Sequence, residues 1–350
     1  MKVRRDEDGR RGSVRKHMHT TEYLKEKKIM KNTNSTYKSI TAAFLAITLA
    51  GCSSTASASS AASSSNGVNM DLANPEKLDC TELVKPDLDL SDATGVLADV
   101  LKEGVLTVAT SPDYPPAEWV DDNGTIYGHE MMIAKYIAES LGVDLAIETS
   151  DFSSTFVSVD TGKADIAFSG YGWKKDREEA YEVSIGYVAD PESEESKHTL
   201  IVPAGQEGNY DSLDDFVGKK IMGQANSLQE MYVTDEILSL DKDGTTQFEK
   251  VATLDQAILG LASGKCDAVA LDNSTAENYV ASSEGAFALS GVFFDLTPYG
   301  DYSGNIALAK KGETDMIKAV NACLETAVEN GYVHTWYLNA KAAAGIQEAE

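Results

Sequence analysis

Two similar segments of the chain each lead into polar residues that could contact a ligand. Residues 162–168 have the sequence Gly-Lys-Ala-Asp-Ile-Ala-Phe, and residues 264–271 have the sequence Gly-Lys-Cys-Asp-Ala-Val-Ala-Leu. Each pattern predicts a helix end, a turn and a buried strand, and its glycine suits the left-handed position that ends a helix. Ser169 and Gly170 follow the first segment, and Asp272 follows the second. Their hydroxyl, backbone N–H and carboxylate groups could bind a small polar molecule.

The elements that must position these residues alternate between strand-like and helix-like stretches. Residues 104–110 are typical of a strand, residues 130–141 of an amphipathic helix, and residues 143–148 of a second strand. This βαβ order predicts parallel sheets flanked by helices. In open α/β sheets ligands bind beyond the carboxyl ends of the strands, which is where the polar residues lie.

The composition is that of a globular protein with a strongly acidic surface. The 350 residues are 42% hydrophobic and 25% charged, and the formal net charge is −26. The length favours two domains, and the repeated segment indicates two α/β lobes of similar build. Nucleic-acid binding is not expected, because it needs basic groups that neutralise phosphates. The sequence supports no metal site or cofactor, since it has no zinc-type cysteine pair. Besides Cys52, the cysteines are the isolated residues Cys80, Cys266 and Cys323; a single disulfide among them stays open, although the sequence does not support one.

The N-terminal region has the features of an export signal. Residues 1–51 carry an excess of lysine and arginine, and the apolar stretch at residues 40–50 is too short to span a bilayer. Leu-Ala-Gly-Cys at residues 49–52 resembles the bacterial lipobox, in which the cysteine is lipidated. We therefore expect Cys52 to anchor the protein on the extracytoplasmic face of a Gram-positive-like cell membrane. A buried cysteine in a core helix is the alternative.

A flexible segment follows the predicted anchor. Residues 53–65 are nearly all serine, alanine and threonine, a composition that cannot build a core. We assign residues 52–95 to a lipid-anchored tether and an N-terminal extension. Met30 begins a signal of ordinary length, so residues 1–29 could precede the true start.

A series of short motifs occurs in a fixed order through most of the chain. Among them are Tyr114-Pro115-Pro116, Asp151-Phe152, and Gly170 with Arg177 beyond it. The others are Gly124, Gly128 and the segments 212–219, 267–272, 300–310 and 319–321. In the order and spacing of these motifs the chain resembles the family 3 extracellular solute-binding proteins, the amino-acid receptors of ABC transporters.

The resemblance implies an α/β, two-lobed periplasmic-binding-protein-like fold of type II, with two crossover strands and the ligand in the interlobe cleft. We expect the crossovers near residues 199–203 and 293–297. Residues 96–200 and 298–345 would form lobe 1, and residues 201–297 would form lobe 2. Such proteins close on their ligand like a hinged trap.

The resemblance also implies a cleft that holds a zwitterion by both charges. Arg177 is the expected partner of the ligand carboxylate, because a guanidinium binds a carboxylate in a bidentate fork. A surface ion pair of Arg177 with Glu178 or Glu179 is the alternative. Asp272 is expected to bind the ligand ammonium, to cap the following helix, or to do both.

Other residues of the predicted cleft have two interpretations each. Tyr114 and Phe152 could enclose the apolar part of the ligand or serve a core alone. Ser227 precedes a predicted helix at residues 228–237, whose first N–H groups could contact the carboxylate, and it could also act only as a cap.

Two positions depart from the family pattern. Lys174 replaces a threonine, and Asn226 replaces a glycine. Lys174 could bring a second cation to the cleft and favour an acidic ligand side chain, or it could point to solvent.

The sequence does not predict an enzyme. It contains no nucleophile elbow and no His-Glu-x-x-His zinc motif. We interpret His129, His198 and His334 as scattered surface or packing residues. A few proteins of this fold are lyases or dehydratases, and Glu118 and Asp151 could act there as an acid/base pair, or could be merely solvated or capping residues.

The resulting prediction is a monomeric, lipid-anchored receptor that binds an amino acid or a similar small zwitterion. It would pass this ligand to the permease subunits of an ABC importer. A receptor that reports its ligand to a sensor without transport fits the sequence equally well.

Overall fold

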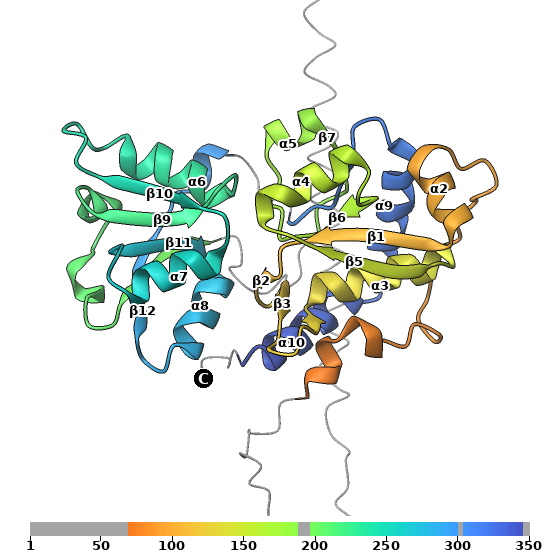
Figure 1. Cartoon of the computed structure of the whole chain (residues 1–350), viewed down its shortest axis with the longest axis horizontal. Helices are drawn as coiled ribbons and strands as arrows, with labels where there is room; N and C mark the ends of the chain where they lie inside the picture. The colour runs from red at the N-terminus through yellow and green to blue at the C-terminus, as the bar shows by residue number, and fades with distance from the viewer. Residues whose placement is uncertain (1–68, 188–196, 300–303, 346–350) are drawn as a thin grey trace, which may run out of the picture. The chain divides into compact units, whose positions relative to one another are not determined.

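The computed structural model describes residues 69–187, 197–299 and 304–345. The signal region, Cys52 and the tether predicted at residues 53–65 lie outside this part of the chain. Within it, no helix combines the length and the apolar character that crossing a membrane requires. The described residues form two five-stranded sheets and one three-stranded sheet (Figure 1).

The first five-stranded sheet has the strand order β5-β1-β6-β13-β7. β1 runs parallel to β5 and β6, as the βαβ pattern predicts, whereas β13 is antiparallel to β6 and β7. The strands are β1 (Val105–Thr110), β5 (Asp144–Thr149), β6 (Ile166–Ala167), β7 (Tyr181–Val183) and β13 (Leu308–Lys310).

The second five-stranded sheet has the order β10-β9-β11-β8-β12. β9 runs parallel to β10 and β11, and β8 is antiparallel to β11 and β12. Each sheet thus joins a parallel half to an antiparallel half, as expected for two lobes of similar build. The strands are β8 (His198–Pro203), β9 (Lys220–Gln224), β10 (Gln247–Val251), β11 (Ala268–Asp272) and β12 (Phe287–Phe293).

We define the first lobe as residues 69–187 and 304–345, and the second lobe as residues 197–299. The predicted two-lobed fold is therefore confirmed, but the first crossover was placed too late. The segment 199–203 belongs to β8, which lies between β11 and β12 in the second sheet, and His198 already pairs with Asp272. Its apolar side chains explain this position, because Leu200, Ile201 and Val202 are fully buried there. The second crossover is predicted at residues 293–297. This segment begins at Phe293, the last residue of β12.

Helices cover both large sheets (Figure 1). Those of the first lobe are α2 (Gly95–Glu103), α3 (His129–Leu141), α4 (Phe152–Thr161), α5 (Lys175–Ala180), α9 (Thr314–Glu329) and α10 (Tyr332–Ala343). Those of the second lobe are α6 (Leu228–Tyr232), the π-helix η6 (Val233–Leu238), α7 (Leu254–Ala262) and α8 (Asn273–Ser282). Gly162 and Gly264 follow α4 and α7 with φ of 73° and 71°, the left-handed conformation predicted for both repeats.

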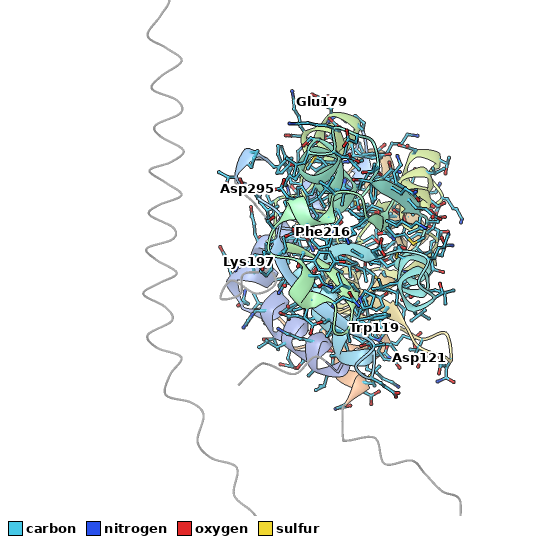
Figure 2. The ribbon with its side chains drawn as sticks, turned by 90° about the vertical axis from the view of Figure 1, so that its left-hand side faces the viewer. Trp119, Asp121, Glu179, Lys197, Phe216 and Asp295 are labelled. Carbon is cyan, nitrogen blue, oxygen red and sulfur yellow. The ribbon has the colours of Figure 1, made fainter. Side chains whose placement is uncertain are left out.

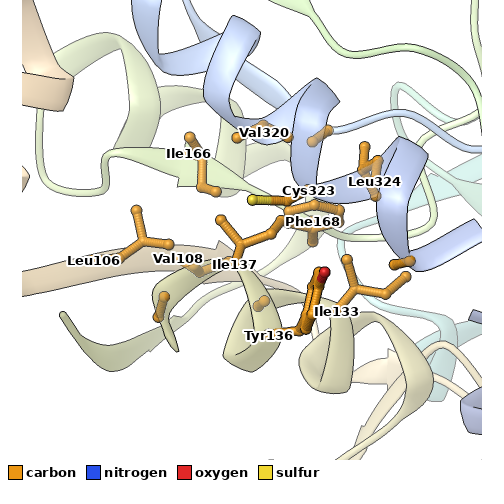
Figure 3. Packing of buried hydrophobic residues seen from close by; sticks show 14 of the residues in the cluster. Leu106, Val108, Ile133, Tyr136, Ile137, Ile166, Phe168, Val320, Cys323 and Leu324 are labelled. Atoms are coloured by element: carbon orange, nitrogen blue, oxygen red, sulfur yellow. The ribbon is translucent and has the colours of Figure 1, made fainter. Parts of the chain in front are cut away.

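The core of the first lobe lies between β1, α3 and α9 (Figure 3). Leu106 and Val108 project from β1 towards Ile137 of α3, and Val320 of α9 closes the layer. Because β1 and β6 are buried strands, their inner side chains are completely enclosed. This packing fixes the carboxyl ends of both strands, where the predicted site residues begin.

The N-terminal extension packs on this lobe from the first described residues onward. The backbone N–H of Gly128 donates to the carbonyl of Ala73 over 3.0 Å, and the Tyr136 hydroxyl donates to the carbonyl of Val84 over 2.7 Å. Cys80 lies in the same core as Cys323, and all cysteines of the described residues are buried and free. The extension therefore belongs structurally to the first lobe.

A small sheet connects the first sheet to α3. It consists of β2 (Asp113–Tyr114), β3 (Glu118–Val120) and β4 (Ile126–Tyr127), paired antiparallel in that order. It carries Asp113, Tyr114 and Glu118 to the side of the molecule where the two lobes meet. Short 3-10 turns complete the described chain: η2 (Met70–Ala73), η3 (Pro75–Lys77), η4 (Glu207–Asn209), η5 (Leu213–Phe216) and η7 (Thr297–Tyr299).

Candidate ligand-binding cavity

A cavity between the lobes brings together most of the predicted site residues. Those that line it are Tyr114, Phe152, Ser169, Gly170, Arg177, Ser227 and Asp272. Glu118 and Lys174 are not part of the lining. The lining also includes polar residues that we did not predict: Asp113, His129, Tyr187, His198, Gln224, Gln229, Ser274, Thr275, Asn305 and Tyr337.

Arg177 lies on α5 and is only 3% exposed. Its Nη1 donates to the carbonyl of Gly172 over 2.5 Å, and its Nη2 donates to the carbonyl of Asn226, in the second lobe, over 2.8 Å. Its Nε has no hydrogen-bond partner among the described residues. Because a guanidinium has five N–H donors, Nε–H and a second hydrogen of Nη2 remain for a planar acceptor such as a carboxylate.

The alternative of a surface ion pair for Arg177 is wrong. In the described part of the chain no carboxylate lies within ion-pair distance of its guanidinium, and the carboxylate of Glu179 pairs with Lys175 at 3.5 Å. Figure 2 shows Glu179 at the outer edge of the described residues, whereas Arg177 is buried. Burial lowers the pKa of Arg177 to about 10, so the group stays charged at neutral pH.

Aromatic rings surround the guanidinium of Arg177. Its central carbon lies 5.7, 5.6 and 5.5 Å from the ring centres of Phe152, Phe156 and Tyr171. Such rings attract a cation through their electron-rich faces. Phe152 lines the cavity and also packs in a core cluster of the first lobe, so its position is compatible with both interpretations.

Tyr114 packs against the backbone at Gly170. Gly170 has φ of 59°, and a Cβ there would lie 2.5 Å from the Tyr114 ring. Only glycine satisfies both demands, because it has no side chain and adopts positive φ freely. The backbone N–H of Gly170 donates to Glu130 over 2.8 Å.

Asp272 is confirmed as a helix cap, and it also lines the cavity. It ends β11 and caps α8, where its Oδ1 accepts the backbone N–H of Thr275 over 3.0 Å. Its Oδ2 is buried and has no partner among the described residues. Asp272 lies opposite His198 in the sheet. Burial lowers the pKa of His198 to about 4, so its imidazole is neutral. The side-chain amide of Gln229 donates to Nδ1 of the same imidazole over 3.0 Å.

Ser227 is confirmed as a helix cap, because its hydroxyl accepts the backbone N–H of Glu230 over 3.1 Å. The residue before it explains a departure from the family pattern. Asn226 has φ of 64°, and asparagine is the residue that replaces glycine most readily in this region. Its Nδ2 donates to the hydroxyl of Ser153, in the first lobe, over 3.0 Å.

Glu118 lies behind the lining rather than in it. It is fully buried, and its Oε1 accepts the hydroxyl of Ser169 over 3.1 Å. Burial and the neighbouring charge of Glu130 hold the pKa of Glu118 well above its usual range. Glu130 in turn accepts the hydroxyl of Tyr187 over 2.6 Å. This carboxyl pair therefore supports Ser169 and Gly170 from beneath.

The remaining predicted residues lie apart from the cavity. Lys174 occupies the N-cap of α5, where burial and the charge of Arg177 lower its pKa. Asp151 caps α4 by accepting the backbone N–H and the hydroxyl of Ser154. Because Asp151 caps a helix and Glu118 pairs with Glu130, the predicted acid/base pair of Glu118 and Asp151 is not assembled.

Two of the three histidines interpreted from the sequence are packing residues, as one of the two interpretations predicts, because the rings of His129 and His198 pack edge-on against Tyr337 and Tyr232. His129 and His198 are 3% and 5% exposed, and both line the cavity. His129 begins α3, directly after the small sheet, and His198 begins β8. The only sequence signal was their position at the start of predicted elements near other site residues.

Comparison with known proteins finds similarity to amino-acid-binding proteins. The sequence is 25% identical over 241 residues to the L-cystine-binding protein TcyJ of Escherichia coli, covering 68% of this chain and 82% of that protein. The structure is similar to that of the amino acid ABC transporter substrate-binding protein AbpA of Streptococcus pneumoniae bound to L-arginine, with a TM-score of 0.62 and 26% identity. That match covers 72% of this chain and all of the other.

An enzyme also shows partial similarity. Cyclohexadienyl dehydratase of Pseudomonas aeruginosa is 30% identical over 115 residues, which are 33% of this chain and 41% of that enzyme. The broader match is to a family model. Residues 106–338 match the model of the bacterial extracellular solute-binding proteins, family 3. The matched segment includes most of the described residues. With its two lobes and the cavity between them, the chain belongs to this family of solute-binding proteins.

Proposed function

We propose that this protein captures an amino acid between its lobes and delivers it to the permease of an ABC transporter. The observation that carries the proposal is the pair formed by Arg177 and Asp272. They come from different lobes, have opposite charges and line one cavity, and each has a buried polar atom without a partner among the described residues. An amino acid supplies the missing groups, because its carboxylate matches Arg177 and its ammonium matches Asp272.

Hydrogen bonds between the lobes support binding by closure. The hydroxyl of Thr275 donates to the carbonyl of Pro115 over 3.1 Å, and the hydroxyl of Tyr279 donates to the carbonyl of Asp113 over 3.0 Å. Each bond is possible only when the lobes are together. A ligand that bridges Arg177 and Asp272 would favour this closed state, since it makes its full set of contacts only there.

The named ligands of the relatives support an amino acid in general. One binds L-cystine and another L-arginine, so the relatives do not agree on one side chain. Lys174 lies outside the cavity lining, which removes the reason for expecting an acidic side chain.

For the cellular setting, we propose a monomer held at the extracytoplasmic face of the membrane by a lipid on Cys52. This proposal rests on the sequence at residues 49–52 and on the family, whose members are extracellular. Such a tethered receptor would remain close to its permease while its lobes open and close.

The test is a thermal-shift screen of residues 66–350 with the twenty amino acids and L-cystine. A ligand at 100 times its Kd stabilises the folded state by about 2.7 kcal/mol, so the matching amino acid should raise Tm by several degrees. Mass spectrometry after long incubation should recover that ligand unchanged. No shift with any amino acid would refute the proposed ligand class, and an altered ligand would favour an enzyme instead.

A further inference from the structure

His129 lines the same cavity as Arg177 and Asp272 and takes no part in their hydrogen bonds. Its Nδ1 lies 3.0 Å from the carbonyl oxygen of Pro116, which can only accept a hydrogen bond. Nδ1 must therefore carry the proton. In a neutral imidazole the other nitrogen, Nε2, is then an acceptor. Burial lowers the pKa of His129, which favours this neutral form.

The acceptor at Nε2 is buried and has no hydrogen-bond partner among the described residues. The ring of Tyr337 meets the imidazole edge-on, with 5.3 Å between ring centres and 81° between planes. The Tyr337 hydroxyl lies 3.3 Å from the Ser274 hydroxyl, so Tyr337 holds the ring in place while bonding elsewhere. A buried acceptor that lacks a donor is unfavourable, and proteins rarely leave one.

We propose that His129 recognises the side chain of the ligand, by accepting at Nε2 a hydrogen bond from an N–H or O–H group. This inference rests on the proposed function, which assigns the ligand carboxylate to Arg177 and its ammonium to Asp272. The favoured ligands are then amino acids whose side chains end in a donor, such as a guanidinium, an ammonium, a carboxamide or a second amino-acid head group. Aliphatic and thioether side chains of similar length are disfavoured.

A neutral imidazole requires a donor and not a positive charge. Two pairs of amino acids separate these properties. L-lysine and L-norleucine have similar chains, and only lysine has a terminal donor, which is charged. L-glutamine and L-methionine are also similar in length, and only glutamine has a donor, which is neutral. Both donor-bearing members should bind the wild-type protein more tightly than their partners.

The experiment is titration calorimetry of these four amino acids, together with L-arginine and L-cystine, on the wild type and on His129→Phe. Phenylalanine retains a ring that can pack against Tyr337 and removes the acceptor. The affinity ratio within each pair should fall by about tenfold in the variant, the usual effect of one hydrogen bond to a buried group. His129→Gln, which can place an amide oxygen near the position of Nε2, should recover part of the ratio.

His334→Phe is the matched control, because His334 is partly exposed on α10 and lies outside the cavity lining. It should leave both ratios unchanged, and all variants should show the wild-type circular dichroism spectrum. Ratios that are the same in wild type and His129→Phe would overturn the role of His129. That role would also be overturned if His129→Phe does not fold and His129→Gln has no effect on the ratios. Failure of every amino acid to bind the wild type is a different result, which refutes the proposed function itself.

Discussion

The carboxylate of Asp113, in the first lobe, accepts a hydrogen bond from the backbone N–H of Leu254, the first residue of α7 in the second lobe, over 2.6 Å. The side-chain amide of Gln224, also in the second lobe, donates to the same carboxylate over 3.3 Å, and the Ser111 hydroxyl donates over 3.0 Å. Burial nevertheless raises the pKa of Asp113 to about 6. The Asp113 carboxylate thus forms hydrogen bonds to the second lobe, and its pKa lies in a pH range where unfolding can be measured.

Asp113 should make stability depend on pH. Its pKa is raised in the folded protein, whereas an unfolded aspartate titrates near 3.9, so the folded state binds the proton more tightly. Its contribution is therefore present below about pH 4 and is lost as pH rises through about 6, with a total of about 3 kcal/mol. We expect Asp113→Asn to remove this part of the slope of unfolding free energy against pH. Urea unfolding between pH 4 and 7 measures it.

The exposed neighbour Asp122 gives the control for this experiment, because Asp122→Asn removes the same charge from the surface. That variant should keep the wild-type slope. If Asp113→Asn also keeps it, the carboxylate is not buried in the way described.

Removing either charge of the predicted anchor pair should weaken ligand binding strongly. Loss of one partner from a buried, hydrogen-bonded charge pair costs roughly 2–5 kcal/mol, which is about 30-fold or more in affinity. Arg177→Ala removes the cation. Asp272→Asn removes the charge but retains a side chain that caps α8 well. Titration calorimetry with the amino acid found by the thermal-shift screen measures both.

Lys174→Ala is the comparison, because Lys174 lies next to Arg177 in the structure but outside the cavity lining. It should change affinity little. Wild-type affinity in both Arg177→Ala and Asp272→Asn would mean that the ligand is not held by these two charges.

Asn226 should tolerate glycine better than alanine. Its φ of 64° strains any residue with a Cβ other than asparagine or aspartate by roughly 1–2 kcal/mol. Asn226→Gly loses the hydrogen bond to Ser153, whereas Asn226→Ala loses that bond and adds the strain. The free energy of unfolding in urea should therefore be about 1 kcal/mol lower for Asn226→Ala than for Asn226→Gly. Ser153→Ala isolates the bond, and equal stability of the two Asn226 variants would argue against the left-handed conformation.

Cys52→Ala should release the protein from membranes. A lipid-modified cysteine supplies the hydrophobic attachment, and the apolar stretch at residues 40–50 is too short to replace it by spanning the bilayer. Fractionation of cells after a high-salt wash tests this, with Cys80→Ala as the control cysteine. A Cys52→Ala protein that stays entirely in the membrane fraction contradicts the lipobox prediction.

Local patterns in the sequence predicted the parts of the site that depend on single elements. The repeated segment located the ends of β6 and β11, and therefore Ser169 and Asp272, because a buried strand followed by a helix start is a local signal. The glycines after α4 and α7 and the caps Ser227 and Asp272 were likewise visible from residue type. The lobes followed from the repeat and from the family motifs.

Contacts between distant segments could not be predicted in the same way. Glu118 and Glu130 become neighbours only because the small sheet folds back onto the start of α3. His129 is enclosed by Tyr337 of α10, which lies at the other end of the folded chain. Neither contact leaves a periodic or compositional trace, so the sequence predicted neither the Glu118–Glu130 pair nor the place of His129 in the cavity lining.

The order of the first sheet has a consequence for the route by which the chain folds. β6 pairs with β13, and the core between β1 and α3 is closed by α9, so the first lobe needs both ends of the described chain. The second lobe is one continuous segment, residues 197–299, whose strands all lie within it. As the chain emerges from its N-terminus during synthesis, the second lobe can complete its pairings while the first still lacks β13 and α9. The half-built sheet then exposes the edge of β6, an edge at which chains aggregate. The interval between emergence of residue 299 and emergence of α9 is therefore the stage at which the incomplete first lobe is most exposed to aggregation.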